Sequence, residues 1–272
     1  MLGYPKQNDQ EASMGRTVRL VVAAQFAAFS VLALGAVTAQ AEPPAPRKIA
    51  FIVPGQQLYA GGPVWASLFE PMRSALEQRG FETHYIDAPG RLLREDAELI
   101  RARVTSIAEE ADEVALVGHS VGGVSARWFL AELGGHPLVD SSIAIGTAQY
   151  GSPGGCTQGP ADGYDACVYS DLFPQLNAGD DTPGKTRYTV LQSSGEWADG
   201  RLDGGQCRVY VDGILGSGTG FDHIVEVADP TLLAELGAAA DGECTGTYVD
   251  EADGTITWQD TMTETAPPVP YN

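Results

Sequence analysis

Gly118-His119-Ser120-Val121-Gly122-Gly123 is the stretch of sequence that decides the fold. An apolar run, residues 114–117, precedes it, and a helix-like run, residues 124–130, follows it. A strand, a sharp turn and a helix therefore meet at Ser120, and the glycines let the backbone and the helix approach the serine closely. In a chain with 33 glycines this pattern also arises as an ordinary Gly-rich turn, but the strand before it and the helix after it favour a nucleophilic serine.

Apolar runs of strand length alternate with amphipathic segments through the middle of the chain. Pro71 interrupts the first helical segment and is expected to kink or split it, while Asp229-Pro230 has the pattern of a helix start. This alternation predicts a doubly wound, mostly parallel α/β sheet in one domain over residues 48–245. Strands are expected at residues 48–53, 82–86, 114–117, 142–146, 186–191 and 207–211, and helices at 64–78, 92–110, 124–130 and 230–236.

Two segments depart from this alternation. Residues 150–186 are rich in Gly, Pro and Asp and contain two cysteines, so we expect a disulfide-braced excursion over the face that carries Ser120. Residues 248–258 are expected to form a hairpin that turns at Asp253-Gly254, and this hairpin and a tail would occupy residues 246–272.

The N-terminal segment has the pattern of a targeting signal. Arg16 and Arg19 precede a mostly apolar run, residues 20–37, and Ala39-Gln40-Ala41 fits a small-residue cleavage site. The sequence predicts a signal peptide over residues 1–41 and a proline-rich leader over 42–47, hence secretion to the exterior or the periplasm. An uncleaved membrane anchor and a start at Met14 are alternatives.

The charge and the cysteine content of the chain indicate which binding partners and which cellular compartment to expect. The chain has 16 Lys and Arg against 36 Asp and Glu, a net charge of −20, so the basic stripe that nucleic-acid binding needs is not expected. Four cysteines in an exported chain suggest two disulfides, with three pairings possible. We favour Cys156–Cys167, which closes a short Gly/Pro-rich loop, and Cys207–Cys244, which ties a late strand to the C-terminal segment.

A serine hydroxyl needs a base within hydrogen-bond reach. His119 is adjacent to Ser120 and should point away from it, His84 lies within an expected strand, and His136 follows a helix exit. His223 comes after the last expected parallel strand and just before the final helix, where a nucleophilic serine on this topology finds its base. The sequence therefore favours His223.

The base in turn needs a carboxylate that fixes its tautomer. Glu196 and Asp199 compete in the loop that follows the strand at 186–191, and Asp203 lies further along. Asp212 and Asp222 are weaker candidates, because the first follows the wrong strand and the second shares the loop of the base.

Stabilisation of an oxyanion requires two backbone N–H groups aimed at one point. Val121 supplies one, directly after the serine at the start of its helix, and Gln56, in the loop after the first strand, is expected to supply the other.

These residues resemble the α/β-hydrolase superfamily and, more narrowly, the small secreted bacterial lipases called class 2 lipases. The resemblance covers residues 49–236 and is carried by the stretch 118–123, by the stretch 176–189 and by Asp222-His223-Ile224. Pro54-Gly55 stands where that family usually has His-Gly.

The resemblance implies an α/β-hydrolase fold with Ser120 as nucleophile, His223 as base and the amides of Val121 and Gln56 as oxyanion donors. It assigns Glu196, where the family has aspartate, as the acid, and Asp199 stays the alternative.

The expected function is that of a secreted serine hydrolase of carboxylic esters, acting through an acyl-enzyme on acylglycerols or other apolar esters. Alternatives are a polyester depolymerase, an acyltransferase with the same residues and a non-catalytic binding module. No metal or organic cofactor is implied; Asp180-Asp181 could bind calcium, but a turn is favoured. We expect a monomer that does not bind nucleic acid and, after signal cleavage, does not insert stably into membranes.

Overall fold

A computed structural model describes residues 45–57, 63–212 and 222–270 of the 272-residue chain. The predicted signal peptide, residues 1–41, lies outside the described residues, as do the first three residues of the predicted leader. Among the helices of the described part, none combines the length and the apolar character needed to cross a membrane.

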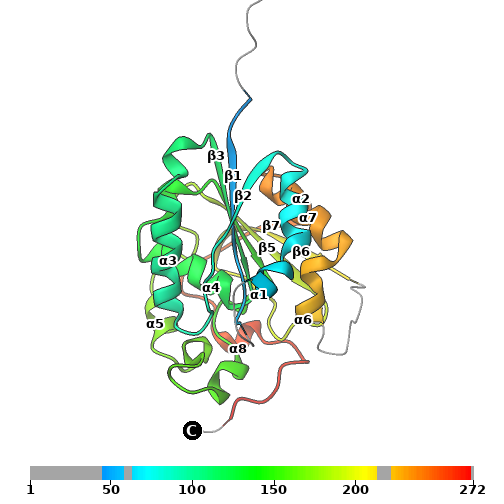
Figure 1. Cartoon of the computed structure of the whole chain (residues 1–272). Helices are drawn as coiled ribbons and strands as arrows, with labels where there is room; N and C mark the ends of the chain where they lie inside the picture. Colours follow the sequence, from blue (N-terminus) through cyan, green and yellow to red (C-terminus); the bar gives the residue numbers. More distant parts are fainter. Residues whose placement is uncertain (1–44, 58–62, 213–221, 271–272) are drawn as a thin grey trace, which may run out of the picture. The chain divides into compact units, whose positions relative to one another are not determined.

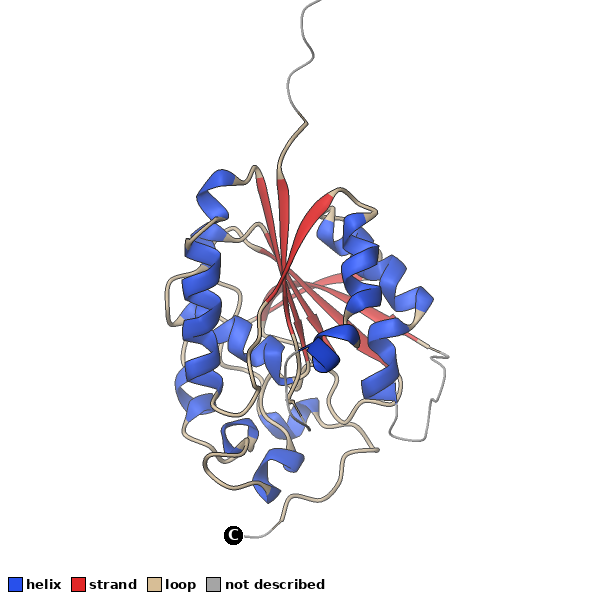
Figure 2. Ribbon diagram, in the orientation of Figure 1, coloured by secondary structure: helices blue, strands red, loops and turns tan. Residues whose placement is uncertain are grey.

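A seven-stranded sheet in the order β2-β1-β3-β4-β5-β6-β7 forms the centre of the domain. All neighbouring strands from β2 to β6 are parallel, and β7 is antiparallel to β6 (Figure 2). The mostly parallel sheet confirms the predicted fold class. The strands are β1 Lys48–Val53, β2 Phe81–Tyr85, β3 Glu113–His119, β4 Ser141–Ile145, β5 Arg187–Ser193, β6 Gly204–Val211 and β7 Thr247–Glu251.

Helices cover both faces of the sheet (Figure 1). Alternate residues of β1 divide between two apolar cores: Phe51 packs in the core with α3 and α4, and Ile52 in the core with α2 and α7. A strand buried on both faces explains the continuous apolar run seen in the sequence. The helices are α1 Pro63–Ser67, α2 Glu70–Glu77, α3 Leu93–Thr105, α4 Val121–Ala131, α5 Leu172–Leu176, α6 Asp222–Val225, α7 Pro230–Ala240 and α8 Trp258–Thr261.

Local sequence signals account for several helix boundaries. The helical segment predicted at 64–78 is split into α1 and α2, and Pro71 lies in the first turn of α2, where its missing N–H removes no helical hydrogen bond. Asp229 caps α7 as predicted, because its Oδ1 accepts hydrogen bonds from the amides of Thr231 and Leu232 at 2.9 and 3.1 Å.

Two disulfides are present, Cys156–Cys167 and Cys207–Cys244, in the pairing that the sequence favoured. The first lies in the excursion after β4, which contains 3₁₀ turns at Pro153–Thr157 and Tyr164–Ala166. The second joins β6 to the segment that follows α7, and it brings that segment alongside the last parallel strand.

The predicted C-terminal hairpin is wrong in its second arm. Residues 247–251 form β7, but β7 pairs with β6 rather than with residues 255–258. The chain turns at Gly254 and then enters α8 instead of a strand. The reason is a capping box: Asp260 accepts hydrogen bonds from the amide and the hydroxyl of Thr257 at 2.9 and 2.6 Å, which starts a helix.

Candidate active site

Ser120 occupies a strained turn between β3 and α4. It is the one non-glycine residue with a positive φ, 56°, in the described part of the chain. Such strain persists where the surrounding structure enforces it, and it is concentrated at functional sites. A Cβ atom on Gly122 would lie 2.2 Å from the carbonyl oxygen of Pro54, so glycine is needed where the turn meets the loop after β1. The sharp turn predicted from the sequence is therefore present.

Ser120, His223 and Glu196 come together at the carboxyl ends of the parallel strands. Nε2 of His223 lies 2.7 Å from Oγ of Ser120, and its Nδ1 lies 2.9 and 3.0 Å from the two carboxylate oxygens of Glu196. Glu196 follows β5, and His223 is the second residue of α6. The hydroxyl, the imidazole and the carboxylate thus form one continuous hydrogen-bonded chain, in which Nδ1 can donate to Glu196 while Nε2 accepts from Ser120.

The C-terminal segment holds the loop of Glu196 in place. The hydroxyls of Thr263 and Thr265 both donate to the carbonyl oxygen of Glu196, at 2.6 and 3.0 Å. The amide of Thr263 also donates to the carbonyl oxygen of Trp197 at 2.8 Å. No local sequence signal marks this support, because the two segments are more than 60 residues apart.

Asp199, the alternative acid, points elsewhere. Its carboxylate accepts a hydrogen bond from the amide of Arg201 at 3.1 Å and forms ion pairs with the side chains of Arg201 and Arg208 at 3.4 and 3.6 Å. Burial raises the pKa of Asp199 from its ordinary value, although both arginines oppose that shift. Between the two competing carboxylates, Glu196 is the one that contacts His223.

The loop of Gln56 lies directly against the serine. A Cβ atom on Gly55 would lie 2.7 Å from Cβ of Ser120 and 3.3 Å from its Oγ, so only glycine permits this approach. Val121 is the first residue of α4, where helical N–H groups have no partner within the helix. Gly55 thus brings the loop that contains Gln56 against Ser120, and Val121 follows Ser120 at the start of α4.

His119 packs against His223 and Glu226 rather than toward Ser120. Its Nε2 lies 2.9 Å from the carbonyl oxygen of His223 and 3.2 Å from Oε1 of Glu226, and its ring is tilted against that of His223 with centroids 4.9 Å apart. Burial, and then the neighbouring His223, lower the pKa of His119 to about 3, so that its ring is neutral.

One cluster of potential metal ligands exists within the described residues, namely His119, His223 and Glu226. Nδ1 of His223 faces Glu196 and Nε2 of His119 faces a carbonyl oxygen, while Nδ1 of His119 is buried without a hydrogen-bond partner. A carbonyl oxygen only accepts, so Nε2 of His119 carries a proton and cannot ligate a metal in this state.

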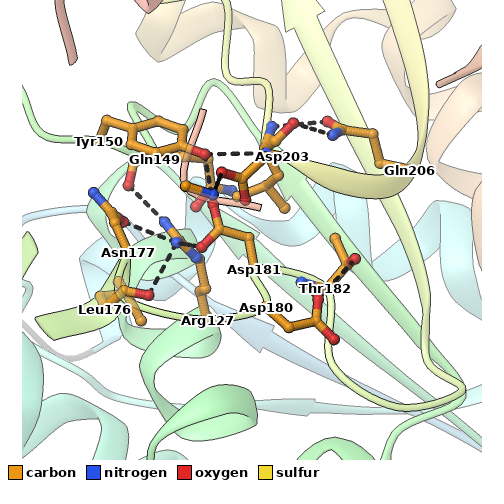
Figure 3. A network of polar contacts seen from close by, with 12 residues as sticks. Arg127, Gln149, Tyr150, Leu176, Asn177, Asp180, Asp181, Thr182, Asp203 and Gln206 are labelled. Carbon is orange, nitrogen blue, oxygen red and sulfur yellow. Dashed lines mark hydrogen bonds and ion pairs between the residues drawn. The ribbon is translucent and has the colours of Figure 1, made fainter. Parts of the chain in front are cut away.

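Asp180 and Asp181, weighed above as calcium ligands, have other partners (Figure 3). The Asp181 carboxylate is buried in an ion pair with Arg127 of α4 and accepts a hydrogen bond from the hydroxyl of Tyr150 at 2.5 Å. Asp180 accepts a hydrogen bond from the amide of Thr182 at 2.8 Å, which is a turn interaction. The cationic guanidinium of Arg127 thus neutralises the carboxylate that calcium would need.

The described structure resembles solved lipases and phospholipases. Lipase B of Aspergillus fumigatus matches with a TM-score of 0.57 at 15% identity, over 82% of this chain and 58% of its own. The propeptide form of the Bacillus licheniformis lipase BlEst2 matches with a TM-score of 0.56 at 15% identity, over 79% and 54%. Phospholipase PlaB of Legionella pneumophila matches with a TM-score of 0.53 at 14% identity, over 72% and 60%.

These likenesses show that the chain has the α/β-hydrolase fold. The matched region spans between 54% and 60% of the length of these three proteins. No protein-family model matches the sequence, and neither does any curated protein.

Proposed function

We propose that this protein hydrolyses carboxylic esters through an acyl-enzyme intermediate on Ser120. The observation that carries the proposal is the hydrogen-bonded chain from Oγ of Ser120 through His223 to Glu196. In this mechanism His223 takes the proton of Ser120 as Oγ attacks the ester carbonyl, and returns it to the departing alcohol. A water molecule activated by the same imidazole then releases the acid.

Two backbone N–H groups, those of Gln56 and Val121, would hold the negative oxygen of each tetrahedral intermediate. The close approach of Gly55 to Ser120 and the place of Val121 at the start of α4 support this assignment. Removal of one such donor typically lowers kcat by about 10²- to 10³-fold, so these amides carry a large share of the expected rate enhancement.

Apolar esters are the proposed substrate class. Trp197 adjoins Glu196, Ile224 adjoins His223, and both side chains are exposed at 40% and 48%. Large exposed apolar groups beside reacting residues favour substrates with apolar acyl or alcohol groups. Secretion is proposed on the two disulfides, which form and persist in oxidising compartments.

The test compares the full chain with Ser120→Ala on p-nitrophenyl esters of increasing acyl length. We expect a loss of at least ~10⁴-fold in kcat/KM and loss of fluorophosphonate labelling, with folding unchanged. The control is Ser106→Ala, which removes an exposed hydroxyl that bonds only to the carbonyl oxygen of Arg103. Retained hydrolysis in Ser120→Ala would refute the proposal. Product analysis with added alcohol separates hydrolysis from acyl transfer.

A further inference from the structure

Glu226 is a buried carboxyl next to the base that the mechanism above does not use. It opens the 3₁₀ turn Glu226–Ala228, three residues after His223, and its side chain is 0% exposed. Its Oε1 lies 3.2 Å from Nε2 of His119 and 3.7 Å from Nδ1 of His223. A fully buried carboxyl is unfavourable unless its surroundings compensate for the lost hydration, so this position requires an explanation.

Two carboxyl groups therefore surround one imidazole nitrogen. Glu196 has an oxygen 2.9 Å from Nδ1 of His223, and Oε1 of Glu226 is only 0.8 Å farther away, at 3.7 Å. The end of β4 leaves room for this arrangement: a Cβ atom on Gly146 would lie 2.0 Å from Oε1 of Glu226 and 3.2 Å from Nδ1 of His223.

The surroundings of Glu226 disfavour a charge on its carboxyl. Burial, and then the charge of Glu196, raise the pKa of Glu226 well above its ordinary value, and the buried Asp222 adds to the effect. His119 does not neutralise Glu226, because its own ring stays uncharged. This direction favours the protonated form of Glu226, while Glu196 is the carboxylate within hydrogen-bond distance of Nδ1 of His223.

Glu226 and His119 also fix the backbone of the base. The Nε2–H group of His119 points to the carbonyl oxygen of His223 and to Oε1 of Glu226, and thus joins the carboxyl to the segment that carries the base. The two imidazole rings pack together with an interplanar angle of 31°. His119 thus contacts both the main chain and the ring of His223 and restrains the position of each.

We propose that Glu226 is a positioning residue of the active site, which fixes His223 together with His119 and becomes the partner of Nδ1 when Glu196 is removed. The proposal rests on the function proposed above for Ser120, His223 and Glu196. Removal of Glu196 takes away the like charge beside Glu226, so the remaining carboxyl can ionise. Its Oε1 then has less than an ångström to move to reach hydrogen-bond distance of Nδ1.

The first test is a double-mutant cycle in the full chain, with kcat/KM measured on a p-nitrophenyl ester. We expect Glu226→Gln to lower kcat/KM by about threefold in the wild-type background but by at least about 30-fold in Glu196→Ala, since the two carboxyls act on the same nitrogen. The control is Asp203→Asn, which alters a buried carboxyl outside the site and should act equally in both backgrounds. Equal effects of Glu226→Gln in both backgrounds would overturn the proposal.

The second test needs no activity and so separates this inference from the proposed function. Proton NMR detects the proton on Nδ1 of His223, which resonates far downfield while a carboxylate accepts it. We expect that resonance to persist in Glu196→Ala and to be lost in Glu196→Ala/Glu226→Gln. Its loss in Glu196→Ala alone would refute the proposal even if the protein hydrolysed no ester. Glu196→Val, which retains part of the side-chain volume but offers no hydrogen-bond acceptor, replaces Glu196→Ala if that variant does not fold.

Discussion

The side-chain amides of Gln56 and Gln158 bind each other across the active-site edge of the sheet. Nε2 of Gln56 donates to Oε1 of Gln158 at 2.6 Å, and Nε2 of Gln158 donates back to Oε1 of Gln56 at 3.2 Å. Nε2 of Gln56 also donates to the carbonyl oxygen of Asp162 at 2.6 Å. Residues 158 and 162 both lie in the loop that Cys156–Cys167 closes, so this disulfide-braced loop holds Gln56, the residue proposed above as an oxyanion donor.

We therefore expect Gln158→Ala to lower kcat by about tenfold with little change in KM, because a looser Gln56 amide weakens oxyanion binding rather than ground-state binding. Gln158→Glu, which can still accept from Nε2 of Gln56, should recover part of the loss. The matched control is Thr157→Ala, whose exposed hydroxyl bonds only to the carbonyl oxygen of Gly154. Equal losses in Gln158→Ala and Thr157→Ala, measured by steady-state kinetics, would contradict this role.

The assignment of the acid is tested by a pair of isosteric substitutions. Glu196→Gln should lower kcat/KM by at least about 100-fold, because its amide keeps the place beside Nδ1 of His223, which excludes Glu226 from that position, yet cannot supply the charge that stabilises the imidazolium. Asp199→Asn should change kcat/KM by less than about twofold, since Asp199 contacts arginines and not His223. Ester hydrolysis by the purified proteins gives both values. The reverse order of effects would make Asp199 the acid.

Asp203 is a buried carboxyl whose backbone amide donates to the hydroxyl of Tyr150, next to Arg127 and Asp181. It should make the stability of the folded protein depend on pH. Burial, reinforced by Asp181, raises the pKa of Asp203 from 3.8 to about 7. Between these two values the folded protein binds a proton that the unfolded chain releases, so stability decreases as the pH rises through this window.

Asp203→Asn removes that titration. The side-chain amide of the asparagine can still donate to Asp181, and its oxygen can still accept from the backbone N–H of Gly254. We expect its Tm to exceed that of the wild type by about 2–4 °C at pH 8 and to match it near pH 3.5. Asp250→Asn, at an exposed position on β7, serves as the control. Thermal unfolding followed by circular dichroism gives the Tm of both variants at each pH. A gain in the Tm of Asp203→Asn that is the same at every pH would argue against a protonated Asp203 in the folded protein.

Local and periodic signals were sufficient for most of the fold. The apolar run at 48–53, the turn at Ser120 and the cap at Asp229 each depend on neighbours within a few residues, and all three are present. The mostly parallel character of the sheet then follows from the alternation of strands and helices along the chain. Ser120 and His223 could be predicted from their places after a strand and before the final helix, whereas Glu196 was assigned by the family resemblance and Asp199 stayed the alternative.

The remaining features depend on contacts between distant segments, which a single sequence does not encode locally. Gln158 and Thr263 lie in loops that contain no recognisable motif. From the sequence alone, Glu226 is indistinguishable from an ordinary glutamate in a helix. The helix at 258–261 could have been found from the spacing of Thr257 and Asp260, but alternating β-branched residues before it favoured a strand instead.

The outer strands of the described sheet are β2 and β7, and β7 limits how the sheet can grow. It has only five residues and ends in Asp250-Glu251. A second molecule that approached this edge would bring its own negative charge, from a chain of net charge −20, against those carboxylates. Strand β7 therefore disfavours edge-to-edge pairing with a second molecule at its own edge of the sheet.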